Sequence, residues 1–416
     1  MNLVAIALAG LGTPLFIVVS FSALHSFYSI DIDLTVLFIE MYRLAETPSL
    51  TAIPFFTFSG FLLAHSNAPN RLVALSYSLL GWLPGGLAIV ALFICTFFTA
   101  LTGASGVTII ALGGLLYPSL KTAQYDEHFS LGLLTTSGSL GLLFPPSLPL
   151  ILYGIIASVP IDQLFLAGLI PGLLLLLVLS LYTIVKMPAQ KEVCRPVNKQ
   201  PIWPLVRDSI WEIGIPFILV GGIFSGLIAL SEGAVLCTVY LLLVEVVLKK
   251  EIPLRSLPDI IVKSMGILGA IYIILGSSMA YTSYLVDQQI PNALLSFIQL
   301  HIDSKWILLI ALNFFLLAVG CLVDMFSALI LVVPLVLPLA QAYDIHPIHL
   351  GIIFLTNLEI GYSTPPIGLN LFIASLRFKK PIIFLYRASI PFLALLFVCL
   401  LLITYIPTLS LVLITP

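Results

Sequence analysis

Long apolar runs separated by short polar breaks dominate this 416-residue sequence. A membrane-spanning helix needs about 20 mostly apolar residues, and many windows of the chain meet that requirement. The pattern predicts an all-α polytopic membrane protein. The predicted spans cover residues 3–24, 52–67, 79–100, 128–158, 161–186, 208–230, 232–249, 260–284, 304–319, 346–376 and 386–410.

Two further apolar stretches, 101–124 and 320–343, are interrupted by small residues, polar residues or proline. Each stretch is too short to cross a membrane twice as straight helices. Irregular backbone at membrane depth is tolerated only where protein or a watery cavity surrounds it. We therefore expect a re-entrant helical hairpin in each stretch.

The composition agrees with a membrane protein and excludes several other classes. Hydrophobic residues make up 60% of the chain and charged residues only 9%, whereas a soluble domain carries about a quarter charged residues. The net charge of −2 gives no reason to expect a nucleic-acid partner. The five cysteines lack the spacing of a disulfide framework or a transition-metal site. No phosphate-binding GxxxxGK[ST] loop is present, which excludes ATP hydrolysis by that route.

The distribution of lysine and arginine predicts the orientation in the membrane. These residues gather in the segments 186–207, 249–263 and 377–387, which we assign to the cytoplasm. The first positive residue is Arg43, so the apolar start is expected to be the first span and not a cleaved signal peptide.

A polar segment, 187–207, is predicted to be a cytoplasmic linker between two halves, 1–186 and 208–416. In each half a hairpin candidate is followed about 40 residues later by a Pro-Pro pair, as an internal repeat would place it. Each pair interrupts an apolar span, which predicts broken helices over 128–158 and 346–376. Repeats with interrupted helices at matching places are typical of secondary transporters, so we expect two inverted repeats.

The interruption in the first half combines small residues with hydroxyl groups. Unwinding a helix there frees main-chain carbonyls for a cation and main-chain amides for an anion. A close contact between two helices is the simpler alternative for small residues, but the repeated arrangement favours an ion site. The predicted ion-binding residues of this half are Thr102, Gly103, Ser105, Gly138 and Pro145.

An acidic residue, Asp324, marks the interruption in the second half. A carboxylate between apolar segments is costly unless it faces a cavity or a partner, so we predict a sodium ligand, with a structural salt bridge as the alternative. The predicted ion-binding residues of this half are Asp324, Ser327, Gly361, Thr364 and Pro365. Glu359 is either a proton or ion ligand or a residue that stabilises a loop by hydrogen bonding.

The residues beside the two Pro-Pro pairs are expected to hold the carboxylate of a substrate. They are Ser147, Pro146, Thr364, Pro366 and Asn370. An ion channel and an intramembrane enzyme are the competing classes. No acid, base or nucleophile pair with diagnostic spacing is found in the sequence, so an enzyme is not expected.

Across nearly its whole length the sequence resembles the large, DctM-like membrane subunit of the tripartite ATP-independent periplasmic (TRAP) transporters. The segments that carry the resemblance are 100–114, 138–149, 165–172, 222–234, 320–338 and 361–370. The chain departs from the family pattern at Leu230-Ser231-Glu232, where the family more often has Pro-Thr-Glu.

The resemblance implies sodium-coupled uptake of an organic anion such as a C4-dicarboxylate, with sodium as the coupling ion and no other cofactor. It implies two partners, a periplasmic solute-binding protein and a small membrane subunit of about four helices. It also implies location in the bacterial inner membrane and an elevator-type fold, in which a domain carrying both hairpins moves the solute across.

Overall fold

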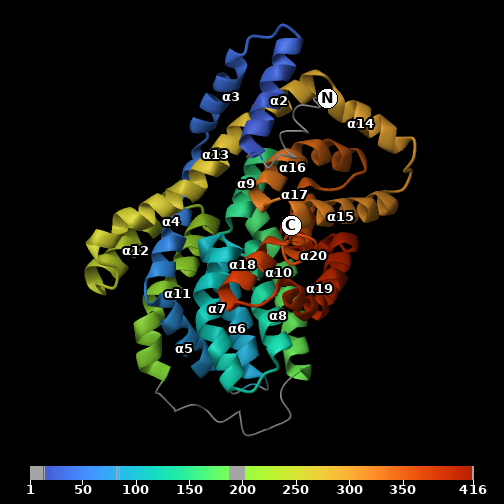
Figure 1. The fold of residues 1–416 in the computed structure, drawn as a ribbon. Coiled ribbons are helices and arrows are strands. Elements are labelled where there is room, and N and C mark those ends of the chain that lie inside the picture. The colour runs from blue at the N-terminus through green and yellow to red at the C-terminus, as the bar shows by residue number, and fades with distance from the viewer. Residues whose placement is uncertain (1–12, 14, 81–82, 84, 187–201, 415–416) are drawn as a thin grey trace.

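The computed structural model describes residues 13, 15–80, 83, 85–186 and 202–414, and all regular elements among them are helical (Figure 1). The first half contains α2 (Leu15–Ser29), α3 (Thr35–Ala45), η1 (Pro48–Thr51), α4 (Ala52–His65), α5 (Ala68–Leu80), α6 (Gly86–Thr102), α7 (Ser105–Thr122), α8 (Glu127–Ser137), η2 (Leu140–Leu143), α9 (Leu148–Ala157) and α10 (Ile161–Val185). The second half contains α11 (Ile202–Phe224), α12 (Leu230–Leu241), the π-helix η4 (Leu242–Leu248), η5 (Leu254–Ser256), α13 (Leu257–Asp287), α14 (Ile290–Gln299), α15 (Lys305–Leu322), α16 (Met325–Ala342), α17 (Pro347–Gly361), α18 (Leu369–Phe378), α19 (Ile382–Tyr405) and α20 (Thr408–Leu411).

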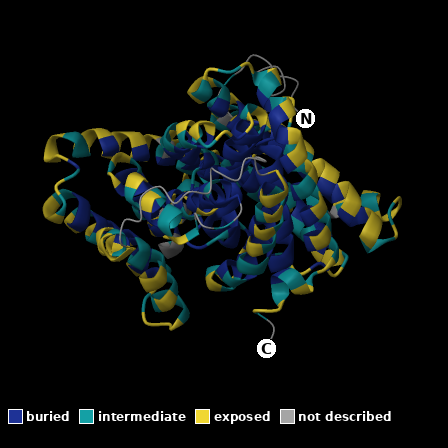
Figure 2. Cartoon of the chain, turned by 90° about the horizontal axis from the view of Figure 1, so that it is seen from below, coloured by how far each residue is buried: buried dark blue, intermediate teal, exposed yellow. Residues whose placement is uncertain are grey.

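The prediction of a multi-span helical membrane protein is confirmed. Among the described residues six helices are long and apolar enough to cross a membrane, and a seventh span is possible if α8 to η2 and α9, bent by 44°, count as one. Large apolar side chains such as Phe217, Leu177 and Phe314 are exposed on the outside, where lipid can cover them. Figure 2 shows that the buried residues gather in the central helices, whereas the outlying helices carry most of the exposed ones.

The two helix–turn–helix units differ from the predicted hairpins. Residues 105–122 and 325–342 each form a single helix, so the stretches 101–124 and 320–343 do not contain both arms. The turn at Gly103 joins α6 to α7 because its left-handed backbone, with φ +65°, ends α6. The turn before Asp324 joins α15 to α16 because this side chain caps α16.

Several predicted boundaries also shift. The linker prediction 187–207 falls mostly outside the described residues, but α11 already begins at Ile202. Half of the predicted span 3–24 is likewise outside, and α2 continues to Ser29. The helices α3, α5 and α14 were not predicted as separate elements, because they are short and each mixes polar with apolar residues.

The two halves exchange contacts reciprocally in the central helices. In each half a helix–turn–helix unit (α6–α7 or α15–α16) is followed by a helix, a Pro-Pro loop and a second helix. The helix after the loop packs on the unit of the other half: α18 on α7, and α9 on α16. In addition, α19 packs on α8, and α17 packs on α10. These helices form one central body, which is flanked by α2 to α5 and α11 to α13.

A cluster of five charged residues joins the flanking helices α5, α11 and η4. Arg71 pairs with Glu212 and Glu251 and lies with Nη2 3.2 Å from Oε1 of Glu245, while Nζ of Lys249 lies 2.6 Å from Oε1 of Glu212. The side chains of Glu212 and Glu245 are fully buried. Three carboxylates are therefore held by two cations, and Arg71 contacts all three.

We predict that Arg71→Met destabilises the purified protein strongly, by about 3–5 kcal/mol, because it leaves buried carboxylates without their main partner. The measurement is thermal unfolding in detergent. The control is Arg43→Met, which removes an exposed cation paired with Glu40 at 3.1 Å and should cost about 1 kcal/mol or less. Equal losses from the two substitutions would contradict the structural importance of the cluster.

Candidate functional site

The first helix–turn–helix unit turns at Gly103 and Ala104. The amide of Gly103 donates to the carbonyl oxygen of Thr99 at 2.7 Å, and Ala104 is extended, so α7 starts afresh at Ser105. Thr102, the last residue of α6, is fully buried. The turn therefore presents the carbonyl end of α6 and the amide end of α7 next to each other, which are the ends that attract a cation and an anion respectively.

The first break in the α8–α9 segment lies against this turn. Thr99 Oγ1 donates to the carbonyl oxygen of Gly138 at 2.7 Å. A Cβ added to Gly138 would lie 3.3 Å from the carbonyl oxygen of Ser105, and one added to Gly103 would lie 2.5 Å from Leu148. The structure thus brings Gly103, Ser105 and Gly138, three of the residues predicted for the first ion site, to the same turn.

Ser147 and the Pro145–Pro146 pair lie on the far side of the first break. The peptide bond between the two prolines is cis. Ser147 Oγ donates to the carbonyl oxygen of Leu142, so the hydroxyl already satisfies one carbonyl that the break has freed. All three residues are buried.

The second unit turns at Val323 and Asp324, where the aspartate caps α16. Its Oδ1 accepts from the amides of Phe326 and Ser327, each at 3.1 Å, and its Oδ2 accepts from Ser327 Oγ. The ion pairs of the described residues do not include Asp324, so the alternative of a structural salt bridge finds no support there. The carboxylate is exposed, and its role in this conformation is that of an N-cap.

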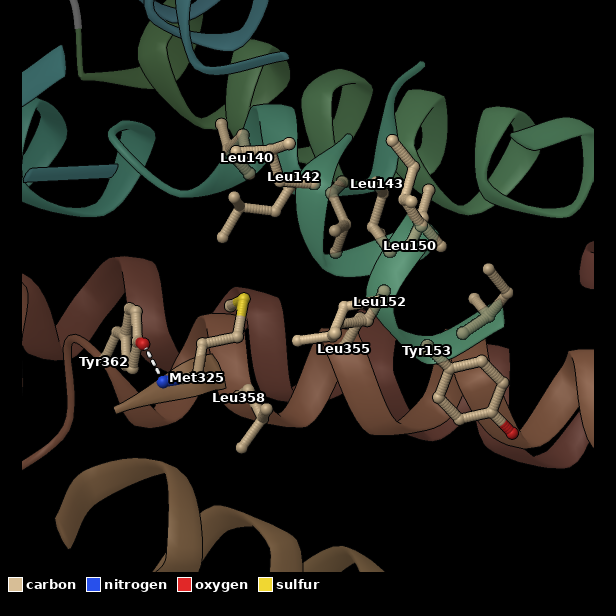
Figure 3. Close-up of a cluster of buried hydrophobic side chains, with 14 of the residues drawn as sticks. Leu140, Leu142, Leu143, Leu150, Leu152, Tyr153, Met325, Leu355, Leu358 and Tyr362 are labelled. Atoms are coloured by element: carbon tan, nitrogen blue, oxygen red, sulfur yellow. Dashed lines mark hydrogen bonds between the residues drawn. The ribbon is translucent and has the colours of Figure 1, made fainter. Parts of the chain in front are cut away.

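The second break wraps around the second turn. A Cβ on Gly361 would lie 2.7 Å from the carbonyl carbon of Gly320, so the two backbones touch. The amide of Gly368 donates to the carbonyl oxygen of Cys321 at 3.2 Å. The hydroxyl of Tyr362 accepts from the amide of Met325 (Figure 3). Gly361 is therefore placed at the turn that carries Asp324.

Thr364 and the Pro365–Pro366 pair form the outer part of this break. Thr364 Oγ1 donates to the carbonyl oxygen of Ile360 at 2.7 Å. The hydroxyl of Tyr386 donates to the carbonyl oxygen of Pro366 at 2.5 Å. The proline pair is again cis, but both prolines are exposed, in contrast to Pro145 and Pro146. The two breaks have the same local form and a different accessibility.

Two hydrogen bonds connect the halves at the breaks. Ser105 Oγ donates to Oδ1 of Asn370 at 2.7 Å, so Asn370, which was predicted beside the second break, contacts the first turn. Ser139 Oγ lies 3.5 Å from the carbonyl oxygen of Glu359. The first turn and the first break therefore lie next to the segment around the second break.

Apolar side chains fill the space between the first break and α17. Figure 3 shows Leu142, Leu143 and Leu152 on one side and Leu355 and Leu358 on the other. All of them are buried. This packing excludes water, which makes each polar group at the breaks more dependent on a bound partner.

Buried polar atoms without a hydrogen-bond partner gather at the second break. Among the described residues they include both carboxylate oxygens of Glu359, Oγ of Ser363 and Nδ2 of Asn370. Buried polar groups are almost always paired, so a cluster of unpaired ones indicates a place for an ion, water or ligand.

Two participants were not predicted from the sequence. The hydroxyl of Tyr362 accepts from the first amide of α16; the one signal for it in the sequence, which was not used, is a hydroxyl next to Gly361 in an interrupted helix. Gly320 permits the contact with Gly361, but a single glycine near the end of an apolar helix has no distinctive signature.

The comparisons with known proteins agree on one family. The family model described as "Tripartite ATP-independent periplasmic transporter, DctM component" matches residues 2–409. The C4-dicarboxylate TRAP transporter large permease protein DctM of Pseudomonas aeruginosa is 32% identical over 376 residues, which are 90% of this chain and 88% of that protein. The ectoine/5-hydroxyectoine TRAP transporter large permease protein UehC of Ruegeria pomeroyi is 31% identical, with 84% and 82% covered.

Two further matches extend the comparison. The isethionate TRAP transporter permease protein DctMQ of Oleidesulfovibrio alaskensis is 31% identical over 86% of this chain, which spans 57% of that longer protein. In structure, the chain is similar to the YdaH transporter of Alcanivorax borkumensis, with a TM-score of 0.57, 13% identity and 88% of each chain covered. The last likeness concerns the fold alone.

We predict that Gly361→Ala destabilises the protein by about 1–3 kcal/mol, because the new methyl group overpacks the contact with Gly320. Gly221→Ala is the control: a Cβ at Gly221 meets nothing within 4 Å. That change should be neutral or should stabilise the protein by about 0.5–1 kcal/mol, since alanine has a higher helix propensity than glycine. Thermal unfolding of both variants checks the prediction, and a Gly361→Ala protein as stable as the wild type would show that α15 and α17 are not closely packed there.

Proposed function

The chain belongs to the DctM family of large permease components of TRAP transporters, and from this premise we propose that it couples sodium entry to the uptake of a small organic anion. As a member of this family it is a multi-pass transporter permease and not an enzyme. The single observation that carries the sodium proposal is the meeting of two unwound segments, with unpaired polar atoms and a helix-capping carboxylate, inside an apolar body.

The first proposed sodium site consists of Thr102, Gly103, Ser105, Gly138 and Pro145. It is supported by the freed carbonyls at the end of α6 and by the bond from Thr99 that fixes the carbonyl group of Gly138 beside them. Sodium is a hard cation, for which oxygen ligands of this kind are suited.

The second proposed site consists of Asp324, Ser327, Gly361, Thr364 and Pro365. Asp324 supplies the only carboxylate of this set and lies next to the hydroxyl of Ser327. Both lone pairs of Oδ1 are used by the two amides that it accepts from, whereas Oδ2 accepts from Ser327 Oγ alone and keeps a lone pair for a cation. No transition metal is proposed, because among the described residues no group of three or more His, Cys, Asp or Glu side chains could hold one.

The substrate carboxylate is proposed to bind between the two breaks, near Ser147, Pro146, Thr364, Pro366 and Asn370. The free Nδ2 of Asn370 is the strongest support, because it is a buried donor without a partner among the described residues. The amides at the start of α7 add positive potential on the same side, next to Ser105, which bonds Asn370.

We propose that the central body moves as an elevator relative to the flanking helices. The exchange of α18 and α9 between the halves supports this, because it locks both turns and both breaks into one unit. It also supports a pair of inverted repeats as the origin of the fold. The charge cluster around Arg71 lies outside this unit, in helices that we take as the static part.

The relatives support a proposal for the partners and the solute class. Their names include a C4-dicarboxylate, ectoine and isethionate transporter, all of which carry small organic solutes. We propose a carboxylate as the solute here, a periplasmic binding protein that delivers it, and a small DctQ-like membrane subunit of about four helices. The proposed location is the inner membrane of a bacterium.

The carboxylate of Asp324 provides a test of sodium binding. We predict that sodium chloride raises the thermal midpoint of the purified wild type, whereas choline chloride does not, with about 2.7 kcal/mol of stabilisation at a sodium concentration of about 100 times Kd. Asp324→Asn should keep the basal stability, because asparagine is an equally good N-cap, but should lose the sodium effect. Asp162→Asn, which removes an exposed carboxylate at the start of α10, is the control. An undiminished sodium effect in Asp324→Asn would remove this residue from the site.

Proteoliposomes distinguish a coupled transporter from a channel. We expect negligible entry of sodium in the absence of an organic anion, because a coupled carrier crosses the membrane with its ion and its solute bound together. Uptake of a labelled C4-dicarboxylate such as succinate, offered as a probe with the binding protein and the small subunit, should depend on an inward sodium gradient. Sodium flux that proceeds without solute or binding protein would identify a channel instead.

A further inference from the structure

The charge cluster around Arg71 contains more carboxyl groups than cations. It consists of three glutamates and two cations, namely Glu212, Glu245, Glu251, Arg71 and Lys249. Oε2 of Glu212 is buried and has no hydrogen-bond partner among the described residues, so the two cations do not satisfy every acceptor. An uncompensated buried charge is costly, so the cluster calls for one further positive charge.

The backbone folds back at the end of η4 and brings two of these glutamates together. The amide of Lys249 donates to the carbonyl oxygen of Val244 at 2.8 Å, which is the π-helical pattern. Lys250 then adopts a left-handed backbone with φ +54°. The amide of Glu251 donates to the carbonyl oxygen of Glu245 at 2.9 Å, and a hydrogen bond joins the two side chains.

A hydrogen bond between two carboxyl groups requires a proton. An ionised carboxylate can only accept, so one of the two groups has to donate through an O–H. Two carboxyl groups that share a site retain one proton in this way, because two negative charges in contact repel each other. One proton would also supply the positive charge that the cluster lacks.

The contacts identify Glu245 as the acid and Glu251 as the carboxylate. Oε1 of Glu251 accepts from Arg71 Nη1, and Oε2 accepts from the amide of Asn67 at 2.7 Å. Burial opposes the charge of Glu251, but the amide of Asn67 and the charge of Arg71 hold its pKa below the ordinary value. The two carboxyl oxygens of Glu245 lie farther from Arg71, at 3.2 and 3.5 Å from Nη2, and its side chain is fully buried.

The other titratable groups near this pair leave the missing charge unsupplied. The charged side chains that act on Glu245 belong to the cluster itself. On the elements packed against η4, Nδ1 of His65 in α4 contacts the carbonyl oxygen of Phe61 at 2.9 Å, and the hydroxyl of Tyr240 in α12 donates to that of Trp211 at 3.0 Å. The remaining groups of α5, α11, α12 and the end of η4 are Tyr77, the exposed Arg207, Asp208 and Lys250, the buried Cys237, and Glu232, which bonds the amide of Ala229 at the start of α12.

We propose that Glu245 and Glu251 form a proton-binding site, in which one shared proton neutralises the charge cluster and holds the end of η4 on α5. The O–H of Glu245 donates to the carboxylate of Glu251, which in turn binds Arg71 of α5. The side chain of Glu251 is 22% exposed, so water reaches the site there. In alkaline medium the O–H bond of Glu245 breaks and its proton passes to water. The two carboxylates then repel each other, and Glu251 turns toward solvent and releases α5.

The first test is infrared spectroscopy of the protein in liposomes, with Glu245→Gln as the reference, since glutamine matches the acid in shape and also donates a hydrogen bond. The wild-type-minus-variant difference at neutral pH should contain the C=O band of a protonated carboxyl group, and alkaline buffer should remove it. In deuterated buffer the band should shift within minutes, because water reaches Glu251. Absence of the band, or a band that alkaline buffer leaves unchanged, overturns the proposal.

Glu251→Gln distinguishes a shared proton from a proton that burial alone retains. This substitution leaves two carboxyl groups for two cations, so Glu245 should ionise and its band should be lost at neutral pH, with the double variant Glu245→Gln, Glu251→Gln as the reference. Asp259→Asn, which removes an exposed carboxylate 3.7 Å from Lys263, is the control and should keep the band. Survival of the band in Glu251→Gln would show that the proton is not shared.

Thermal unfolding at a series of pH values provides the second test. The folded pair keeps its proton at pH values where an unfolded glutamate has lost it, so folding binds one proton. From about pH 5 upward this contribution should raise the unfolding constant of the wild type about tenfold per pH unit, until the pair ionises. Glu245→Gln lacks the contribution, so its thermal midpoint should rise relative to that of the wild type and level off where the infrared band disappears. A difference in midpoint that ignores pH over this interval overturns the site.

Discussion

Every break of a helix inside an apolar body leaves main-chain groups that neither lipid nor apolar side chains can satisfy, and the central body of this protein is organised around that constraint. Hydrogen bonds within the protein satisfy some of these main-chain groups. Thr99 bonds the carbonyl oxygen of Gly138, Gly368 donates to Cys321, and Asp324 caps the first amides of α16. Side-chain atoms of Glu359, Ser363 and Asn370 add to the unsatisfied groups beside the second break, because they are buried without a hydrogen-bond partner among the described residues.

The exchange of helices between the halves determines how the two breaks communicate. Because α18 packs on α7 and α9 on α16, neither break can move without displacing the turn of the other half. The hydrogen bond between the side chains of Ser105 in α7 and Asn370 in α18 is one contact of this arrangement. Two cation sites built on such a frame would be energetically linked, since occupation of one orders backbone on which the other depends.

The sequence was informative where the signal is a property of composition or of a rigid residue. Apolar runs predicted a multi-span helical protein, and the two Pro-Pro pairs predicted the breaks between α8 and α9 and between α17 and α18, because proline bars regular helix wherever it stands. The hairpins were misplaced. Gly103 ends α6 and Asp324 begins α16, so each turn lies near the start of the predicted stretch, and the first arm of each unit lies before that stretch.

The partners of the predicted site residues were harder to obtain from the sequence. Asn370 contacts Ser105 across 265 positions, a pairing that arises only from the exchange of helices between the halves. Asp324 was expected to bind an ion or a basic side chain, and its capping of α16 was missed because the start of that helix had been placed inside a hairpin. Short mixed helices such as α5 were missed because their hydrophobic period is weak over so few residues.

The protein treats buried acidic residues in two opposite ways, and the difference follows from what each region is proposed to do. In the flanking helices Glu212 pairs with Arg71 and Lys249, and Glu245 pairs with Arg71, so both carboxyl groups have fixed partners. Such pairs are costly to break, which suits helices that keep their positions. Glu359, in the proposed moving body, has no fixed partner among the described residues. Movement of this body therefore does not have to break a buried ion pair at Glu359.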